Sequence, residues 1–191
     1  MKNKLVKGFG INDANYAVKP EIDGKRNYCQ FYVTWSNMLS RCYDAKYQAK
    51  YPTYIGCSVS LEWRSFMAFK FWMEQQDWRG NALDKDLLIS GNKTYSPDTC
   101  VFVSLATNNF TTENTAARGD CPLGVSWHGR SKRYEACCRN PFSKKKENLG
   151  YFDCPNEAHL AWKKRKHELS CQLAELQSDE RVANALRLRY A

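Results

Sequence analysis

The stretch "LDKDLLISGNKTYSPDTCVFV", from Leu83 to Val103, alternates charged residues with leucines and ends in a β-branched and aromatic run. Gly91-Asn92 is a turn signal between its two halves. We therefore predict a β-hairpin whose first arm carries Asp84 and Asp86, which strand alternation places on the same face. These carboxylates either bind a metal ion for catalysis or only hold a turn together, and the stretch alone leaves both interpretations open.

The composition favours a globular protein with a polyanionic partner. The chain has 191 residues, of which 43% are hydrophobic and 14% aromatic, enough to build a core and to exclude a disordered chain. Lys and Arg number 29 against 20 Asp and Glu, a net charge of +9. Such a balance is typical of proteins that bind nucleic acid. The alternative is a basic surface with no partner.

The cysteines and the apolar segments indicate a reduced environment away from membranes. None of the nine cysteines forms a C-x-x-C pair, so we expect free, mostly buried thiols and no structural zinc. No apolar run approaches the roughly 20 residues of a membrane helix. The first residues also lack the apolar core of a secretory signal. We expect a cytoplasmic protein with no membrane partner.

Helical periodicity and breaker residues divide the chain. Apolar residues at helical spacing predict an amphipathic helix over 29–44 and a second over 61–76, with Ser60 as its N-cap. A short helix follows "CVFV", and a polar segment rich in Thr, Asn, Ala and Gly follows that helix. We expect an N-terminal arm at 1–28, a first domain at 29–111, a linker at 112–120, a second domain at 121–177 and a terminal helix at 178–191, with Ser178 as its N-cap.

The second domain reads as three strands and a helix. In "SKRYEACCRN", Tyr134, Ala136 and Cys138 alternate with residues expected on the opposite face. A strand over "LGVSWHG" precedes it, and "LGYFD" and a helix near Pro155 follow. We predict an α+β fold, with a small domain of three antiparallel strands packed on one helix.

The excess positive charge gathers in this second domain. Residues 124–166 contain 11 Lys and Arg against 4 acidic residues, a net of +7. Since one sheet face packs on the helix, the other is free, and Arg133 and Arg139 fall on it. Arginine reads guanine in the major groove through two hydrogen bonds, and the run 144–146 suits phosphates. The alternative is an ordinary solvated sheet face.

Four motifs of this domain carry a resemblance. They are G-V-S-W at 124–127, the K-x-aromatic-x-A strand at 132–136, L-G-Y-F-D at 149–153 and E-A-H-L-A-W at 157–162. Together, over about 55 residues, they resemble the DNA-binding domain of plant ethylene-response factors (the APETALA type), in the form attached to phage and mobile-element endonucleases. The resemblance implies that the sheet enters the major groove of double-stranded DNA. It implies as groove-facing residues Ser126, His128, Arg130, Arg133, Glu135, Cys137 and Arg139. Lys132, Lys144, Lys145 and Lys146 complete the expected DNA-binding set.

The first domain carries a second resemblance. The string W-S-N-M-L-S-R-C-Y at 35–43, the motifs within 51–66, the stretch 83–103 and the pair Asn108-Asn109 resemble the HNH-like homing endonucleases of phages, over roughly 29–110. The resemblance implies a ββα-metal fold and phosphodiester hydrolysis in DNA with Mg²⁺ or Mn²⁺. A phage-encoded chain would act in the cytoplasm of a bacterial host, and a monomer is the expected state.

The site residues implied by this second resemblance depart from the family in one respect. An HNH nuclease uses histidine as its general base, and this chain has no histidine before His128. Asp84 takes the base or ligand position, because a carboxylate whose pKa is raised by burial can accept a proton. The implied catalytic set is Asp84, Lys85, Asp86 and Asn92, and the implied metal ligands are Asp84, Asn108 and Asn109.

Two alternatives to catalysis stay open. An inactive nuclease relative would act as a sequence-specific DNA-binding regulator or competitor, and "DKD" with "GNK" would then be a turn-fixing charge cluster. The aromatic N-terminal half could instead bind a host or phage protein. Binding of duplex DNA at low salt discriminates the last alternative from the other two.

Overall fold

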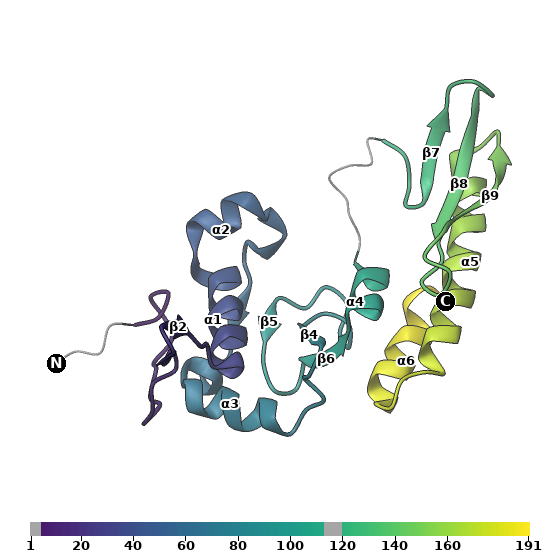
Figure 1. The fold of residues 1–191 in the computed structure, drawn as a ribbon. Helices are drawn as coiled ribbons and strands as arrows, with labels where there is room; N and C mark the ends of the chain where they lie inside the picture. The colour runs from purple at the N-terminus through teal and green to yellow at the C-terminus, as the bar shows by residue number, and fades with distance from the viewer. Residues whose placement is uncertain (1–4, 113–119) are drawn as a thin grey trace. The chain divides into compact units, whose positions relative to one another are not determined.

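The protein is described by a computed structural model that covers residues 5–112 and 120–191 (Figure 1). It contains both α-helices and small β-sheets, which confirms the mixed α and β class. The chain divides into two compact units, Met1–Val103 and Ser104–Ala191. Each unit is described by itself.

The first unit combines short helices with two-stranded sheets. Strands β1 and β2 pair antiparallel, β3 and β5 pair parallel, and β4 pairs with β6. Its elements are β1 (Glu21–Ile22), β2 (Lys25–Arg26), α1 (Gln30–Tyr43), α2 (Ala45–Lys50), η1 (Pro52–Tyr54), β3 (Ser58–Val59), η2 (Glu62–Arg64), α3 (Phe66–Glu74), β4 (Asn81–Asp84), β5 (Thr94–Tyr95) and β6 (Val101–Ser104).

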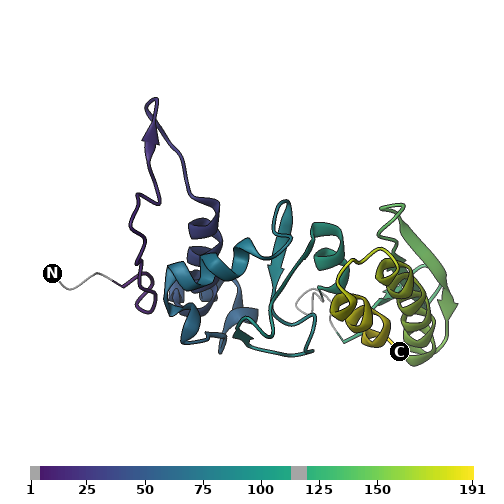
Figure 2. The same ribbon diagram turned by 90° about the horizontal axis from the view of Figure 1, so that it is seen from below.

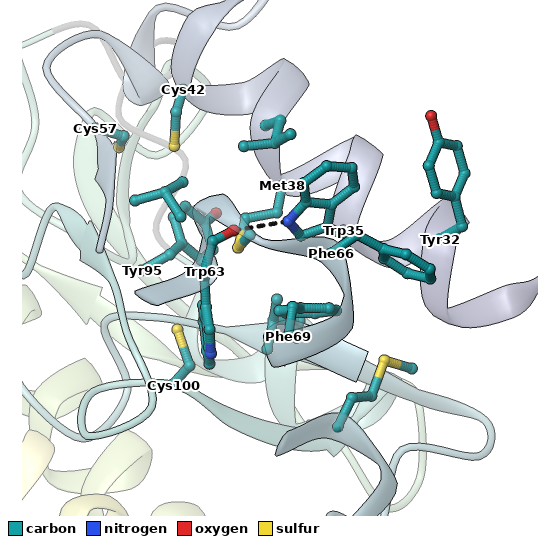
Figure 3. Close-up of a cluster of buried hydrophobic side chains, with 14 of the residues drawn as sticks. Tyr32, Trp35, Met38, Cys42, Cys57, Trp63, Phe66, Phe69, Tyr95 and Cys100 are labelled. Atoms are coloured by element: carbon teal, nitrogen blue, oxygen red, sulfur yellow. Dashed lines mark hydrogen bonds between the residues drawn. The ribbon is translucent and has the colours of Figure 1, made fainter. Parts of the chain in front are cut away.

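The core of the first unit is a cluster of aromatic side chains between α1 and α3 (Figure 3). Trp35 of α1 is fully buried, and its Nε1 donates a 2.8 Å hydrogen bond to the backbone carbonyl of Trp63. Phe66 packs on the ring of Trp35, and Phe69 packs edge-on against Trp63. The bond satisfies the polar atom of a buried indole and joins α1 to the turn before α3. The predicted first helix and its apolar stripe are confirmed.

The second predicted helix begins later than its sequence indicates. The expected helix over 61–76 with Ser60 as N-cap is wrong, since a 3-10 turn precedes a helix that starts at Phe66. The N-cap is Ser65, whose Oγ accepts a hydrogen bond from the N–H of Ala68. Asp13 explains this start, because its carboxylate accepts from the Ser65 hydroxyl at 2.6 Å and from the Met67 N–H at 2.9 Å.

The segment expected as an N-terminal arm is irregular but packs on the core of the first unit. The Ile11 N–H donates to the Arg64 carbonyl. At Gly10 there is no room for a side chain, since an added Cβ would collide with Leu39 and Trp35. Only the hairpin of β1 and β2 stands away from the helices, as the purple ribbon in Figure 2 shows.

The predicted hairpin over 83–103 is present in part: its two ends pair, as β4 with β6, but its first arm is shorter than predicted. β4 ends at Asp84 and pairs with β6, so residues 85–93 form a loop rather than a continued first arm. One cause is local and the other comes from a distant strand. Asp84 Oδ1 accepts from the N–H groups of Asp86 and Leu87, which turns the chain at the strand end. The Ser58 N–H donates to the Lys93 carbonyl, which joins β5 to β3 instead of β4.

The second unit is built on a three-stranded antiparallel sheet, β7-β8-β9, that packs on α5. The strands and helix predicted for the C-terminal domain are therefore present. Within the described ranges, no helix is long and apolar enough to cross a membrane. The elements are α4 (Leu105–Thr111), β7 (Val125–His128), β8 (Arg133–Arg139), β9 (Lys146–Phe152), α5 (Pro155–Ala174) and α6 (Glu180–Arg189).

Helices α4 and α6 pack in the same unit as the sheet. α6 lies beside α5 in both views (Figures 1 and 2), and the Ser170 hydroxyl donates to the Leu186 carbonyl at 2.7 Å. α6 begins after Asp179, whose carboxylate accepts from the Arg181 N–H, so the predicted cap Ser178 is off by one position. Phe110 of α4 contacts the ring of Tyr190 edge-on. Of the linker expected at 112–120, residues 113–119 lie outside the described part of the chain.

Replacing Gly10 tests the packing of the N-terminal segment. The Gly10→Ala variant places a methyl group against Leu39 and Trp35, so overpacking should lower the free energy of unfolding by about 1–3 kcal/mol. Urea denaturation followed by tryptophan fluorescence measures the change. Gly129→Ala is the matched control, because a Cβ there meets no atom within 4 Å. Equal stability of the two variants would contradict the packing described for this segment.

Candidate nucleic-acid interface and carboxylate loop

Asp84 is held at the end of β4 by its own loop. Its Oδ1 accepts hydrogen bonds of 2.9 and 2.7 Å from the N–H groups of Asp86 and Leu87. Burial raises the pKa of the Asp84 carboxyl, and the nearby charge of Asp86 raises it further, although the two backbone hydrogen bonds and Lys85 act in the opposite direction. Asp84 is thus a half-buried carboxyl that binds protons more readily than a free aspartate does.

Lys85 and Asn92 close the same loop from inside. Only 7% of Lys85 is exposed, and its Nζ donates to Asp86 Oδ2 at 2.7 Å and to the Asn92 carbonyl at 3.0 Å. In return, Asn92 Nδ2 donates to the carbonyls of Lys85 and Thr94, at 2.6 and 2.7 Å. The four predicted catalytic residues therefore come together. Their hydrogen-bond partners in the described part of the chain lie within the loop and at Thr94 directly after it, so the cluster holds the turn.

Asp84 and Asp86 do not share a strand face. The prediction assumed that the strand continues through Asp86, but β4 ends at Asp84 and Asp86 lies in the loop. The Asp86 carboxylate pairs with Lys85 instead of joining Asp84 in a common ligand set. The salt bridge from Asp86 gives the buried ammonium of Lys85 a counter-ion, which offsets part of the free-energy cost of removing that charge from water. The side chain of Asp86 therefore has a structural role in this loop.

The predicted metal ligands are divided between the two units. Asp84 belongs to the first, whereas Asn108 and Asn109 lie on α4 in the second. Asn109 lines a cavity of about 250 Å³ together with Arg139, Lys144 and Lys166. Three positive charges disfavour a divalent cation beside Asn109. Among residues 5–112 and 120–191, no three His, Cys, Asp or Glu side chains are placed to hold a metal ion.

The sheet of the second unit has one covered face and one open face. Val125, Ala136 and Cys138 are buried toward α5, with Leu149 and Phe152 packed beside them. The other face carries the alternate residues, which confirms the predicted alternation of β8. We call this second face the open face. It consists of Ser126, His128, Arg133, Glu135, Cys137, Arg139, Lys146, Asn148 and Tyr151.

Carboxylates neutralise part of the charge on the open face. Arg133 makes a two-point ion pair with Asp153, at 2.8 and 3.0 Å. Glu135 accepts from Asn148 at 2.8 Å and lies 3.6 Å from Lys146. A guanidinium held by a carboxylate is less available for guanine than a free one. Arg133 and Lys146, both predicted to contact DNA, therefore have partners within the protein.

The other predicted cations of the interface have no carboxylate partner in the described part of the chain. Arg139 is exposed at the end of β8. Lys144 and Lys145 lie in the β8–β9 loop, and Arg130 and Lys132 lie in the β7–β8 turn. The charge available to a ligand thus sits at both ends of the open face. In the β7–β8 turn, His128 Nδ1 makes a 2.8 Å hydrogen bond with the Ser131 hydroxyl.

Two residues of the open face were missed by the sequence reasoning. A register shift between Ala136 and Cys137 pairs Cys137 with Asn148 and Glu135 with Tyr151. The extra residue in β9 is accommodated at Gly150, whose φ of +125° favours glycine. Asn148 and Tyr151 therefore both reach the open face, although simple alternation would separate them. The glycine within the "LGYF" strand was the available signal for this bulge.

No family model matches the chain, and no curated protein or solved structure is significantly similar to it.

The titration of Asp84 gives a pH-dependent prediction. Folding raises the pKa of the Asp84 carboxyl above the value of about 4 that it has in the unfolded chain. The protonated carboxyl therefore adds to the free energy of unfolding below that unfolded pKa. This stabilisation is lost as the pH rises through the folded pKa. Asp84→Asn keeps an acceptor for the Asp86 N–H but carries no charge. The variant should be at least as stable as the wild type at pH 7, and the difference should shrink near pH 4.

Urea denaturation over a pH series measures this difference. Asp98→Asn is the matched control, since Asp98 is exposed. A variant at Asp84 that is less stable than the wild type at pH 7, with the control unchanged, would show that the ionised carboxylate is needed for the fold.

Proposed function

We propose that the protein binds double-stranded DNA, with the open face of the β7-β8-β9 sheet directed into the major groove. The proposal rests on the sheet itself, which has one face covered by α5 and a polar face bounded at both ends by cations that make no ion pair with any described residue. A β-ribbon fits a major groove about 12 Å wide. The resemblance of the strand motifs to ethylene-response-factor domains supports the same orientation.

The open face separates base-reading residues from phosphate-binding residues. Ser126, Asn148 and Arg139 offer hydrogen-bonding groups at different places on the sheet. Arg139 is exposed at the end of β8 and makes no ion pair with any described residue. Arginine is suited to guanine O6 and N7. Lys144 and Lys145 in the β8–β9 loop suit the phosphate backbone. The affinity for DNA should therefore depend on the base pair that Arg139 contacts, and it should fall strongly as the salt concentration rises.

Replacing Arg139 tests the proposed reading of bases. Duplexes selected by the wild-type protein from a randomised pool provide the probe, and fluorescence anisotropy at a stated salt concentration gives Kd. Loss of a two-point contact with guanine costs about 1–3 kcal/mol, so Arg139→Ala should raise Kd roughly 5- to 150-fold and relax the preference at one base pair. Wild-type affinity should fall with salt at a slope of about −0.9 per phosphate contact.

Arg181→Ala is the matched control for this test. Arg181 lies on α6, is paired with Asp179, and loses the same charge on substitution. The control should bind the selected duplex with nearly wild-type affinity. If Arg139→Ala and Arg181→Ala bind equally well, Arg139 does not read DNA, and the proposed orientation of the sheet is overturned.

A second candidate function is metal-dependent cleavage of DNA by the first unit. The observation in its favour is that burial raises the pKa of Asp84, which a carboxylate general base requires. Lys85 and Asn92 lie beside it, as the resemblance to HNH-like endonucleases implies. Catalysis would require the carboxyl to leave at least part of its present hydrogen bonding, since Oδ1 is occupied by two backbone N–H groups. Mg²⁺ or Mn²⁺ would be the cofactor.

Cleavage of a plasmid that carries the selected duplex tests this candidate. With Mg²⁺ or Mn²⁺, the wild type should nick or break the plasmid, and Asp84→Ala should abolish cleavage while binding persists. Asp98→Ala, an exposed carboxylate in the same unit, serves as the control and should cleave. An inactive wild type that binds the same duplex leaves the protein as a DNA-binding regulator. Cleavage unaffected by Asp84→Ala would remove this residue from catalysis.

A further inference from the structure

A cleft in the first unit lies beside β4, and none of the four residues of the carboxylate loop lines it. It has a volume of about 590 Å³ and lies between one stripe of α1 and the segment that leads into β4. From α1, Thr34, Asn37 and Arg41 line it at helical spacing. From the opposite side, Trp78 and Arg79 line it, with apolar side chains completing the wall. The cleft therefore combines two cations, polar groups and an aromatic ring.

No carboxylate is among the described residues that line this cleft. Arg41 is half-buried, yet among the described residues its guanidinium makes one hydrogen bond, a long one of 3.4 Å from Nη1 to the hydroxyl of Tyr95. Its guanidinium also lies over the ring of Tyr54, 5.6 Å from the centroid. Within the described ranges, Arg41 has no ion pair with any carboxylate. A guanidinium carries five N–H donors and does not lose its charge, so most of its capacity is unused in the protein.

The acidic residues that lie close in sequence to the lining residues have partners within the protein, and Asp77 accepts from the Asn81 side chain at 3.4 Å. Asp86 pairs with Lys85, and Asp84 accepts from two backbone N–H groups. Arg79 lies over the ring of Trp78 at 4.7 Å and likewise makes no ion pair in the described part of the chain. A half-buried charge without a counter-ion costs stability unless a ligand supplies one. The two arginines thus leave the cleft with an excess of positive charge.

We propose that this cleft binds a phosphate group carried by a nucleotide or by a nucleic-acid strand, with Arg41 as the residue that holds it. Guanidinium matches phosphate oxygens through two parallel hydrogen bonds. The Asn37 side chain, one helical turn before Arg41 and exposed, can donate to the same group. The ring of Trp78 offers a surface for a base or a sugar. The cleft contains no residue of the β7-β8-β9 sheet, so its test is independent of the proposed major-groove binding.

Calorimetric titration of the full chain tests the site with three probes, namely inorganic phosphate, thymidine 5′-monophosphate and a short single-stranded oligothymidylate. The wild type should bind at least one nucleotide probe. Binding of the monophosphate as tightly as the oligonucleotide identifies a free nucleotide as the ligand, and preference for the oligonucleotide identifies a strand. If none of the three probes binds, the proposal is overturned.

Two variants and a control assign the binding to Arg41. Arg41→Gln removes the charge, and Asn37→Asp places a carboxylate one turn away, where it can pair with Arg41 in place of the ligand. Each should weaken binding at least about tenfold, since charge-assisted hydrogen bonds are lost. Lys46→Gln on α2 removes an exposed charge from the same unit and should bind as the wild type does.

Thermal denaturation separates a ligand-binding role from a structural one. Without ligand, Arg41→Gln should melt at or above the wild-type temperature, because it removes a half-buried charge that has no counter-ion. A lower melting temperature combined with unchanged affinity for the oligonucleotide would assign Arg41 to the fold and overturn the proposal. Asn37→Asp changes an exposed residue and keeps the binding test valid even if Arg41→Gln fails to fold.

Discussion

The open face of the second unit follows from one packing constraint, that α5 covers only one face of a three-stranded sheet. Burial of Ala136 and Cys138 against this helix fixes the register of β8, and the period of two then directs Glu135, Cys137 and Arg139 to the opposite face. α6 packs on α5 and anchors it through the Ser170–Leu186 hydrogen bond. The helices therefore hold the sheet from one side and leave a polar face directed outward. Such a face, whose end cations make no ion pair within the described ranges, is well matched to a polyanion.

The first unit depends on a different constraint, the burial of polar groups with their partners. Trp35 donates to the Trp63 carbonyl inside the aromatic core, and Lys85 is almost fully buried but paired with Asp86 and with the Asn92 carbonyl. These interactions satisfy the Trp35 indole N–H and the Lys85 ammonium, which are withdrawn from water. Arg41 differs from Lys85, since it lines a cleft and its guanidinium makes one long hydrogen bond within the described ranges. Lys85 is therefore a cation that stabilises the fold, whereas Arg41 is the cation that we propose is available to a ligand.

Sequence patterns predicted the elements whose causes are local and failed where distant residues decide. The alternation of β8 and the helix that begins at Pro155 follow from nearest neighbours, and both were predicted. The start of α3 is set by Asp13, 52 residues before Ser65, so the local capping signal at Ser60 was misleading. The hairpin over 83–103 was predicted only in part, because β4 pairs with β6 at the far end of the stretch, whereas β5 pairs with the distant β3. The loop residues Asp84, Lys85 and Asn92 were identified, but their mutual hydrogen bonds could not be read from the sequence. Arg41 was missed because a sequence does not show which charges lack a partner.

The central claim is that duplex DNA contacts the open face of the sheet, and chemical-shift mapping of the isotopically labelled full chain tests it most directly. On addition of a selected duplex, the account predicts that backbone amide signals of the open face move, including those of Ser126, Glu135, Cys137 and Asn148. Amides on the exposed side of α5, such as those of Leu160 and Lys164, should change little. Shifts confined to α5, or no shifts in the second unit while the duplex is bound, would contradict the account.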